Sequence, residues 1–294
     1  MNGFFEQYQE KLNQSNLSVN TVSSYISDVK LFFDYCDTKK ITYIHEITAK
    51  FLNSYLDRRY KEGATASSVN RTAASLRSYF KFLKNEGYYF TDPSKNLRTK
   101  KVVHKNIEYL SEREINNLCD FGRFFTPKEY RDTLMISLCV NFGLNVTEVC
   151  ALKLSDVNLN VGTVFVSRDK HSRRVVLNDS LLKRMEHYIN TLRPVIINRN
   201  EQTEALFPSS ENKPLSRQSF WKNLNTRCKH LKIKKKISPN NLKYSFMVRK
   251  IEEGASAQSV MQSMGYLDRD SFKRCSDMLK EKYQKSERKN KKGK

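Results

Sequence analysis

The sequence lacks a long hydrophobic run and a secretory signal. Its longest apolar stretch is shorter than the about 20 residues that a membrane-spanning helix needs, so we expect no membrane segment. Residues 1–6 contain no basic region followed by an apolar core, which argues against a signal peptide. No internal repeat is visible. These absences favour a cytoplasmic protein.

Metal-type cysteine spacing is also missing. The six cysteines stand singly, without the paired pattern of a zinc site. Most of them fall within apolar patterns, which predicts reduced thiols in the core. They are Cys36, Cys119, Cys139, Cys150, Cys228 and Cys275. We therefore expect no metal and no cofactor.

Acidic residues are few relative to basic ones. The chain has 53 Lys and Arg against 31 Asp and Glu, a formal net charge of +22. Such an excess favours a polyanionic partner, because neutralising phosphates releases their counterions. A basic protein without such a partner would have the same composition. We expect double-stranded DNA as the partner, a location at the nucleoid, and no small-molecule substrate.

Helical periodicity dominates the first third of the chain. Apolar residues recur at helical spacing in three stretches. The first follows residues 17–21, where Ser18 or Asn20 can cap a helix, and the others begin at Ile47-Thr48 and at Ser67-Ser68. The pattern is interrupted by Asp92-Pro93. Residues 95–108 are polar and basic, which predicts a linker that lies along phosphates or is solvated.

The rest of the chain mixes helices with two short strands. The strands are expected over residues 157–166 and 173–177, around a polar turn. Ser111 and Glu114 form a capping-box pattern. Helices are expected over residues 131–143, 146–154, 179–191, 216–230, 239–253, 256–264 and 268–283.

These patterns predict a mainly α fold with two domains. An all-helical domain would span residues 1–97, and a basic linker residues 98–108. A mostly helical domain with a small antiparallel sheet would span residues 109–284. Residues 285–294 form a basic tail.

The ordered motifs of the chain resemble those of the tyrosine recombinase (phage integrase, Xer-like) family. The segments that carry this resemblance are residues 17–25, 69–80, 92–97, 142–157 and 238–246. The resemblance implies a helical, SAM-like core-binding domain and a mixed α/β catalytic-type domain, which together clamp duplex DNA. It also implies phosphoryl transfer onto a tyrosine hydroxyl. Two arginines would hold the phosphate, a hairpin lysine would act as acid, and two histidines would assist.

Five positions depart from the family pattern. Asn145 and Lys243 stand where the arginines are expected, Asn240 and Tyr266 where the histidines are, and Cys275 where the tyrosine is. Neither Asn nor Lys provides the planar fork that binds a phosphate through two charge-assisted bonds. Losing one transition-state donor costs about 3–4 kcal/mol. We therefore expect no enzymatic activity.

No other residue restores the set. The thiol of Cys275 is a poor nucleophile toward phosphorus, and Tyr283 has no motif around it. Lys170, in the turn between the strands, is either the family's hairpin lysine or a solvated turn residue. Glu148 matches the family's first arginine box.

Basic residues in both domains are candidate phosphate contacts. We expect DNA binding by Arg71, Arg77, Lys100, Lys101, Lys170, Arg173, Arg174, Arg217, Lys222, Lys234, Lys235, Lys236 and Lys243. Trp221 shares a helical face with apolar neighbours and is expected in the core.

Three functions remain open at this point. The favoured one is a DNA-binding protein without strand-cleavage activity, which acts as an architectural, regulatory or accessory factor, either self-associated or beside an active recombinase. The second is a divergent active site-specific recombinase. The third is a protein-interaction module that has kept the fold and lost the ability to bind DNA.

Overall fold

The computed structural model describes residues 2–102, 107–123, 126–167, 172–197, 202–265 and 272–280. The chain forms two compact units, residues 1–105 and residues 106–294, and each has a hydrophobic core of its own. Among the described residues, no helix is both long and apolar enough to cross a membrane.

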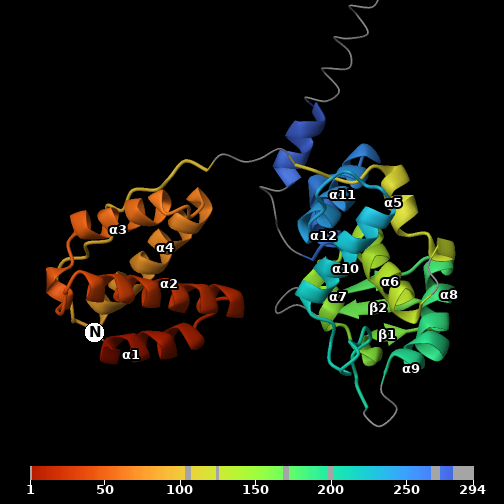
Figure 1. The fold of residues 1–294 in the computed structure, drawn as a ribbon, viewed down its shortest axis with the longest axis horizontal. Coiled ribbons are helices and arrows are strands. Elements are labelled where there is room, and N and C mark those ends of the chain that lie inside the picture. Colours follow the sequence, from red (N-terminus) through yellow and green to blue (C-terminus); the bar gives the residue numbers. More distant parts are fainter. Residues whose placement is uncertain are drawn as a thin grey trace, which may run out of the picture. The chain divides into compact units, whose positions relative to one another are not determined.

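The first unit is entirely helical (Figure 1). Its helices are α1 (Asn2–Asn13), α2 (Val19–Thr38), α3 (Ala49–Lys61) and α4 (Ala66–Asn85), with a short 3-10 turn at Ile44–Glu46. The hydroxyls of Ser18 and Thr48 cap α2 and α3, so Ser18 rather than Asn20 is the cap of α2. Helix α4 begins one residue before the predicted start at Ser67-Ser68, and the Thr65 hydroxyl caps it by accepting from the Ser68 amide.

Helix α1 was not expected from the sequence. It packs against α2 and α4 through one face that buries Phe5, Tyr8 and Leu12. The Tyr8 ring lies 5.2 Å from the Tyr79 ring of α4, edge to face. The tertiary contact with α4 therefore stabilises a short, weakly patterned helix.

The start of the predicted linker is attached to the first unit. Asn53 of α3 accepts from the Arg98 amide at 2.9 Å. Asn70 of α4 exchanges two hydrogen bonds with the backbone of Lys100, at 2.7 and 2.9 Å. These side chains hold a basic segment in a defined path along α3 and α4.

The second unit is built around α6 (Figure 1). Helix α6 (Pro127–Phe142) is buried on most of its surface and packs against helices on several sides. It begins four residues before the predicted start because Thr126 and Glu129 form a capping box ahead of it. The surrounding helices are α5 (Glu112–Leu118), α7 (Val146–Ala151), α8 (Asp179–His187), α9 (Arg193–Ile196), α10 (Arg217–His230) and α11 (Pro239–Glu252).

A small antiparallel sheet lies beside these helices. Its strands, in the order β1–β2–β3, are β1 (Val157–Asn158), β2 (Thr163–Val166) and β3 (Arg173–Val176). The single strand predicted over residues 157–166 is divided in two by a turn, in which Gly162 adopts a φ of +68°. The prediction of a mainly helical fold with a small antiparallel sheet is confirmed.

The C-terminal part of the second unit forms a separate apolar cluster. Helix α12 (Ala257–Ser263) and the helical residues 272–280 pack on α11. Between α8 and α9 the chain makes one π-helical turn, Tyr188–Leu192.

The six cysteines are thiols and form no disulfide, as predicted; all six lie in the part of the chain that the structure describes. Burial raises the pKa of the Cys36 thiol to about 12 and that of Cys150 to about 11, so both are protonated at neutral pH.

Gly143 provides a test of how α6 and α11 approach each other. It has a φ of +70°, and an added Cβ would lie 2.7 Å from the Phe246 ring. Gly63 has a φ of +97° and open space around it. We expect Gly63→Ala to cost about 1–2 kcal/mol for the left-handed backbone alone. Gly143→Ala should lower the free energy of unfolding by clearly more, measured in urea. Equal decreases would contradict close packing at Gly143.

Candidate functional site

Four segments of the second unit meet near the positions that the resemblance singles out. The α6–α7 junction contacts α11 through Gly143 and Phe246. Strand β3 contacts the end of α12, because Arg173 lies against Gly265. Strand β3 also reaches α7 through an ion pair between Arg173 and Glu148. The fold thus brings the two arginine boxes, the hairpin and the Gly265 segment together.

Asn145 caps helix α7. Its side-chain oxygen accepts from the Glu148 amide at 2.9 Å, while the Glu148 carboxylate accepts from the Asn145 amide at 2.8 Å. This is a reciprocal capping box. The oxygen of Asn145 is therefore engaged with the backbone, and residue 145 contributes no positive charge.

Glu148 and Arg173 form the buried ionic contact of this site. Two guanidinium nitrogens of Arg173 donate to the two carboxylate oxygens of Glu148, each at 3.1 Å. The side chains of Glu148 and Arg173 are 3% and 11% exposed. Arg173 was predicted to contact DNA phosphates, but the structure directs its terminal nitrogens at Glu148. Its role in this structure is to join β3 to α7.

The first turn of α11 presents the second box. Asn240 is exposed, and the Lys243 ammonium lies 5.4 Å from the centre of the Tyr244 ring. The sequence did not single out Asn241, which is buried. Its oxygen accepts from the Ser238 amide, and its nitrogen donates to the Glu108 carbonyl at 2.6 Å. The signal for it was its position three residues after the Ser238 cap.

Cys275 is fully buried. Its sulfur lies 4.0 Å from the Met247 sulfur, inside the apolar cluster of α11, α12 and residues 272–280. A group in this position does not face a ligand, which agrees with its expected role as a core thiol. Lys170, Tyr266 and Tyr283 lie outside the described residues.

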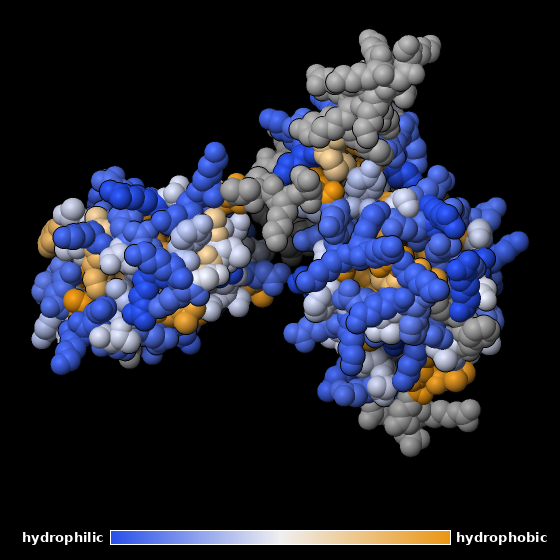
Figure 2. Space-filling model, turned by 45° about the horizontal axis from the view of Figure 1, so that its top comes forward, coloured by the Kyte–Doolittle hydropathy of each residue, from blue (hydrophilic) through white to orange (hydrophobic). Residues whose placement is uncertain are grey.

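The remaining candidate cations differ in how far they are engaged with the protein. Four have partners within the chain: Arg71 with Asp28, Arg77 with the Leu97 carbonyl, Lys100 with Asp57, and Lys235 with Glu114. The others are exposed, namely Lys101, Arg174, Arg217, Lys222, Lys234 and Lys236. Hydrophilic residues cover most of the face shown in Figure 2, and apolar residues form small patches.

Trp221 is not in the core. It is 46% exposed on α10, so the prediction that it is buried is wrong. The buried face of α10 is formed by Phe220, Leu224 and Cys228. Because Phe220 and Trp221 are neighbours on a helix, they point in directions about 100° apart, and only one of them can face the core.

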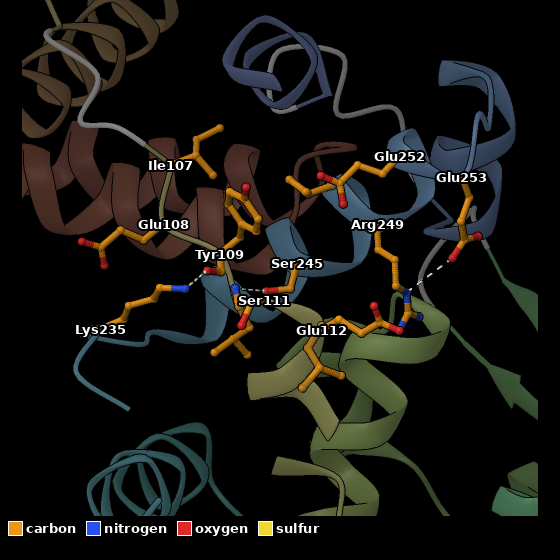
Figure 3. Close-up of a pocket in the computed structure, with 13 residues that line it drawn as sticks. Ile107, Glu108, Tyr109, Ser111, Glu112, Lys235, Ser245, Arg249, Glu252 and Glu253 are labelled. Carbon is orange, nitrogen blue, oxygen red and sulfur yellow. Dashed lines mark hydrogen bonds and ion pairs between the residues drawn. The ribbon is translucent and has the colours of Figure 1, made fainter. Parts of the chain in front are cut away.

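A cavity of about 780 Å³ lies between α11 and the segment that enters the second unit (Figure 3). Ser245 accepts from the Leu110 amide at 2.8 Å, and Lys235 donates to the Tyr109 carbonyl at 3.0 Å. Four carboxylates also line the cavity: Glu108, Glu112, Glu252 and Glu253. Lys235 and Arg249 line it too, so the four carboxylates outnumber the cations and disfavour phosphate there.

The described residues contain no group of three or more His, Cys, Asp or Glu side chains arranged to hold a metal ion.

Residues 108–275 match the Phage integrase family, and residues 5–87 match its N-terminal SAM-like domain. The chain belongs to the phage integrase family. Tyrosine recombinase XerD of Staphylococcus saprophyticus subsp. saprophyticus is 30% identical over 270 residues, which is 91% of each chain.

Solved structures show the same fold. A XerH site-specific recombinase bound to a palindromic difH substrate has a TM-score of 0.72 at 14% identity, over 96% of this chain and 83% of that one. A lambda integrase dimer bound to a COC' core site has a TM-score of 0.69 at 16% identity, over 94% and 95%.

The relatives correct the expectation that the chain is not an enzyme. Relatives that are 30% and 31% identical to this chain, and that match it over 91% of their own length, are named tyrosine recombinases, which are enzymes. The expectation treated five altered positions as the loss of all activity. Effects of residues that act as one catalytic unit are not additive, so the number of substitutions does not give a rate.

The Glu148–Arg173 pair allows a direct test of what holds the site together. Glu148→Ala leaves a guanidinium buried without its carboxylate, which costs about 3–5 kcal/mol of unfolding free energy. Urea unfolding measures this decrease. Glu211→Ala is the control, because Glu211 is 77% exposed and lies 3.7 Å from Lys213, where an ion pair adds little. A decrease no larger than that of the control would show that the pair is not structural.

Proposed function

We propose that this protein is a divergent site-specific recombinase that binds duplex DNA and acts in DNA recombination. The match to relatives named tyrosine recombinases over 91% of both chains carries the proposal. It is supported by the net charge of +22 and by the exposed cations on α10 and before α11. Its solved neighbours include recombinases bound to DNA as dimers and tetramers, which supports self-association as well.

Lys243 is the proposed charge at the scissile phosphate. It stands at the position of the second arginine, near the start of α11, the helix whose Phe246 lies against Gly143 of the α6–α7 junction. It neutralises a phosphate oxygen as a point charge and lacks the two-point grip of arginine. Because position 145 adds no second charge, strand cleavage should be slower than with both arginines, by a factor of about 10²–10³ for the missing donor.

The decisive experiment traps the covalent intermediate. The binding site is first located by a footprint across the genome, and nicked duplexes carrying that site are incubated with the full chain. We expect a covalent protein–DNA adduct that survives denaturation, and peptide mass spectrometry then identifies its nucleophile. Duplex retained at about 100 mM salt without any adduct would contradict recombinase activity. Failure to retain duplex at all would contradict DNA binding.

Lys243→Arg tests which group limits cleavage. Arginine restores two parallel bonds to the phosphate, so the rate of adduct formation should rise, by at most about 10²-fold. Lys250→Arg is the matched control on the same helix, since the Lys250 ammonium lies 2.6 Å from Glu253. An equal effect of both substitutions, or none, would remove Lys243 from the site. Cys275→Tyr, which would place the family's tyrosine at position 275, is a poor substitute for this test. Position 275 is buried, and overpacking it costs about 1–3 kcal/mol.

A further inference from the structure

A buried carboxylate in the first unit collects donors from two neighbouring helices. Asp28 of α2 is fully buried. Arg59 of α3 donates to its Oδ1 at 3.4 Å, and Arg71 of α4 donates to the same oxygen at 3.0 Å. Hydroxyls of α4 complete the set, with Thr72 at 3.2 Å on Oδ1 and Ser75 at 3.0 Å on Oδ2.

The two arginines share one acceptor, so their guanidinium groups lie close together. Two positive charges against one carboxylate leave an excess of one positive charge at this point. The Arg71 side chain is 48% exposed and that of Arg59 is 21% exposed. Each guanidinium has five N–H donors, and Asp28 engages only part of them. The unit therefore presents fixed, partly exposed donors to an anion.

More cations lie on the segment that α3 and α4 hold. Asn70, which precedes Arg71, holds the backbone of Lys100 through two hydrogen bonds. Arg98 and Lys101, on the same segment as Lys100, are exposed. A surface of this kind suits a repeating polyanion such as the DNA backbone.

Holding α2, α3 and α4 together does not by itself require a buried carboxylate. Replacing a buried ionic group by well-packed apolar side chains is often neutral or stabilising. A carboxylate that orients two arginines does something that apolar packing cannot, because it fixes the direction of their remaining donors before the ligand arrives. Ordering these long side chains in advance removes part of the entropy cost of binding.

We propose that Asp28 is a positioning residue, which holds Arg59 and Arg71 as a preformed pair for the phosphate backbone of duplex DNA. This inference rests on the proposed DNA binding and adds Arg59 to the contacts expected from the sequence. Arg59 and Arg71 touch the phosphates, and Asp28 acts through them.

For Asp28→Asn, the positioning role and the change in net charge predict opposite effects on DNA binding. Asp28→Asn keeps the shape of the side chain and raises the net charge by one, so simple electrostatics predicts tighter binding to duplex DNA. The proposal predicts the opposite, about tenfold weaker binding, equivalent to one charge-assisted hydrogen bond fewer. The slope of log affinity against log salt should also fall by about one for each phosphate that the variant no longer neutralises. Electrophoretic retardation of the full chain measures both.

Asp34→Asn is the matched control, since Asp34 is exposed on the same helix and the charge change is identical. It should bind DNA as tightly as the original chain or more tightly. Arg71→Lys provides a second variant that keeps the charge and has an exposed side chain, so it should fold. Because an ammonium lacks the fork that reaches Asp28 and a phosphate together, it should weaken binding, whereas Arg113→Lys in the second unit should not.

Thermal unfolding of each variant separates a damaged fold from weakened DNA binding. If folded Asp28→Asn and Arg71→Lys bind like their controls with an unchanged salt slope, the network only joins helices, and the inference is wrong. If the original chain does not bind duplex, the proposed function itself fails. The two failures are therefore distinct.

Discussion

A buried ion pair, Glu148–Arg173, connects the segments around the candidate site of the second unit. The Glu148 carboxylate accepts hydrogen bonds from the Asn145 amide, at the start of α7, and from the guanidinium of Arg173, on β3. Arg173 in turn lies against Gly265, where the absence of a side chain leaves room for the guanidinium. A single carboxylate thus fixes three segments that are distant in sequence. Its burial makes the arrangement rigid, because an unpaired charge in that position would be costly.

Arg249 of α11 supports the same arrangement from the other side of the α6–α7 junction. It donates to the Asn141 side chain at 2.9 Å and to the Val140 carbonyl at 3.1 Å, at the end of α6. The junction is therefore held in place by packing at Gly143 and by these hydrogen bonds. The start of α11, with Lys243, is positioned relative to Asn145 even though neither residue retains the group that the family resemblance implies.

Several acidic residues in this basic chain organise basic side chains. Asp28 orients two arginines, Glu148 orients a third, and Asp57 and Glu114 each engage a lysine. The number of basic residues alone therefore does not tell how many of them face a ligand. Arg173 shows this most clearly, since its charge is almost entirely withdrawn from the surface.

The sequence alone determined the mainly helical character, most helix starts and the family resemblance. These features depend on local rules: caps such as Ser18 and Ser111 accept backbone amides within one turn, and apolar spacing marks a buried face. It did not reveal α1, whose stability comes from Tyr79 and other residues far along the chain. It misplaced Trp221, because two adjacent aromatic residues fit a helical pattern equally well until the packing chooses one.

Only the tertiary structure decided which charged residues are engaged with each other. The partners of Arg71 and Arg173 stand 43 and 25 positions away, and no local spacing predicts such pairs. The same holds for Cys275, whose neighbour Met247 is 28 positions away. The amino-acid sequence states which groups exist, whereas the distances that decide their chemistry arise only when helices pack.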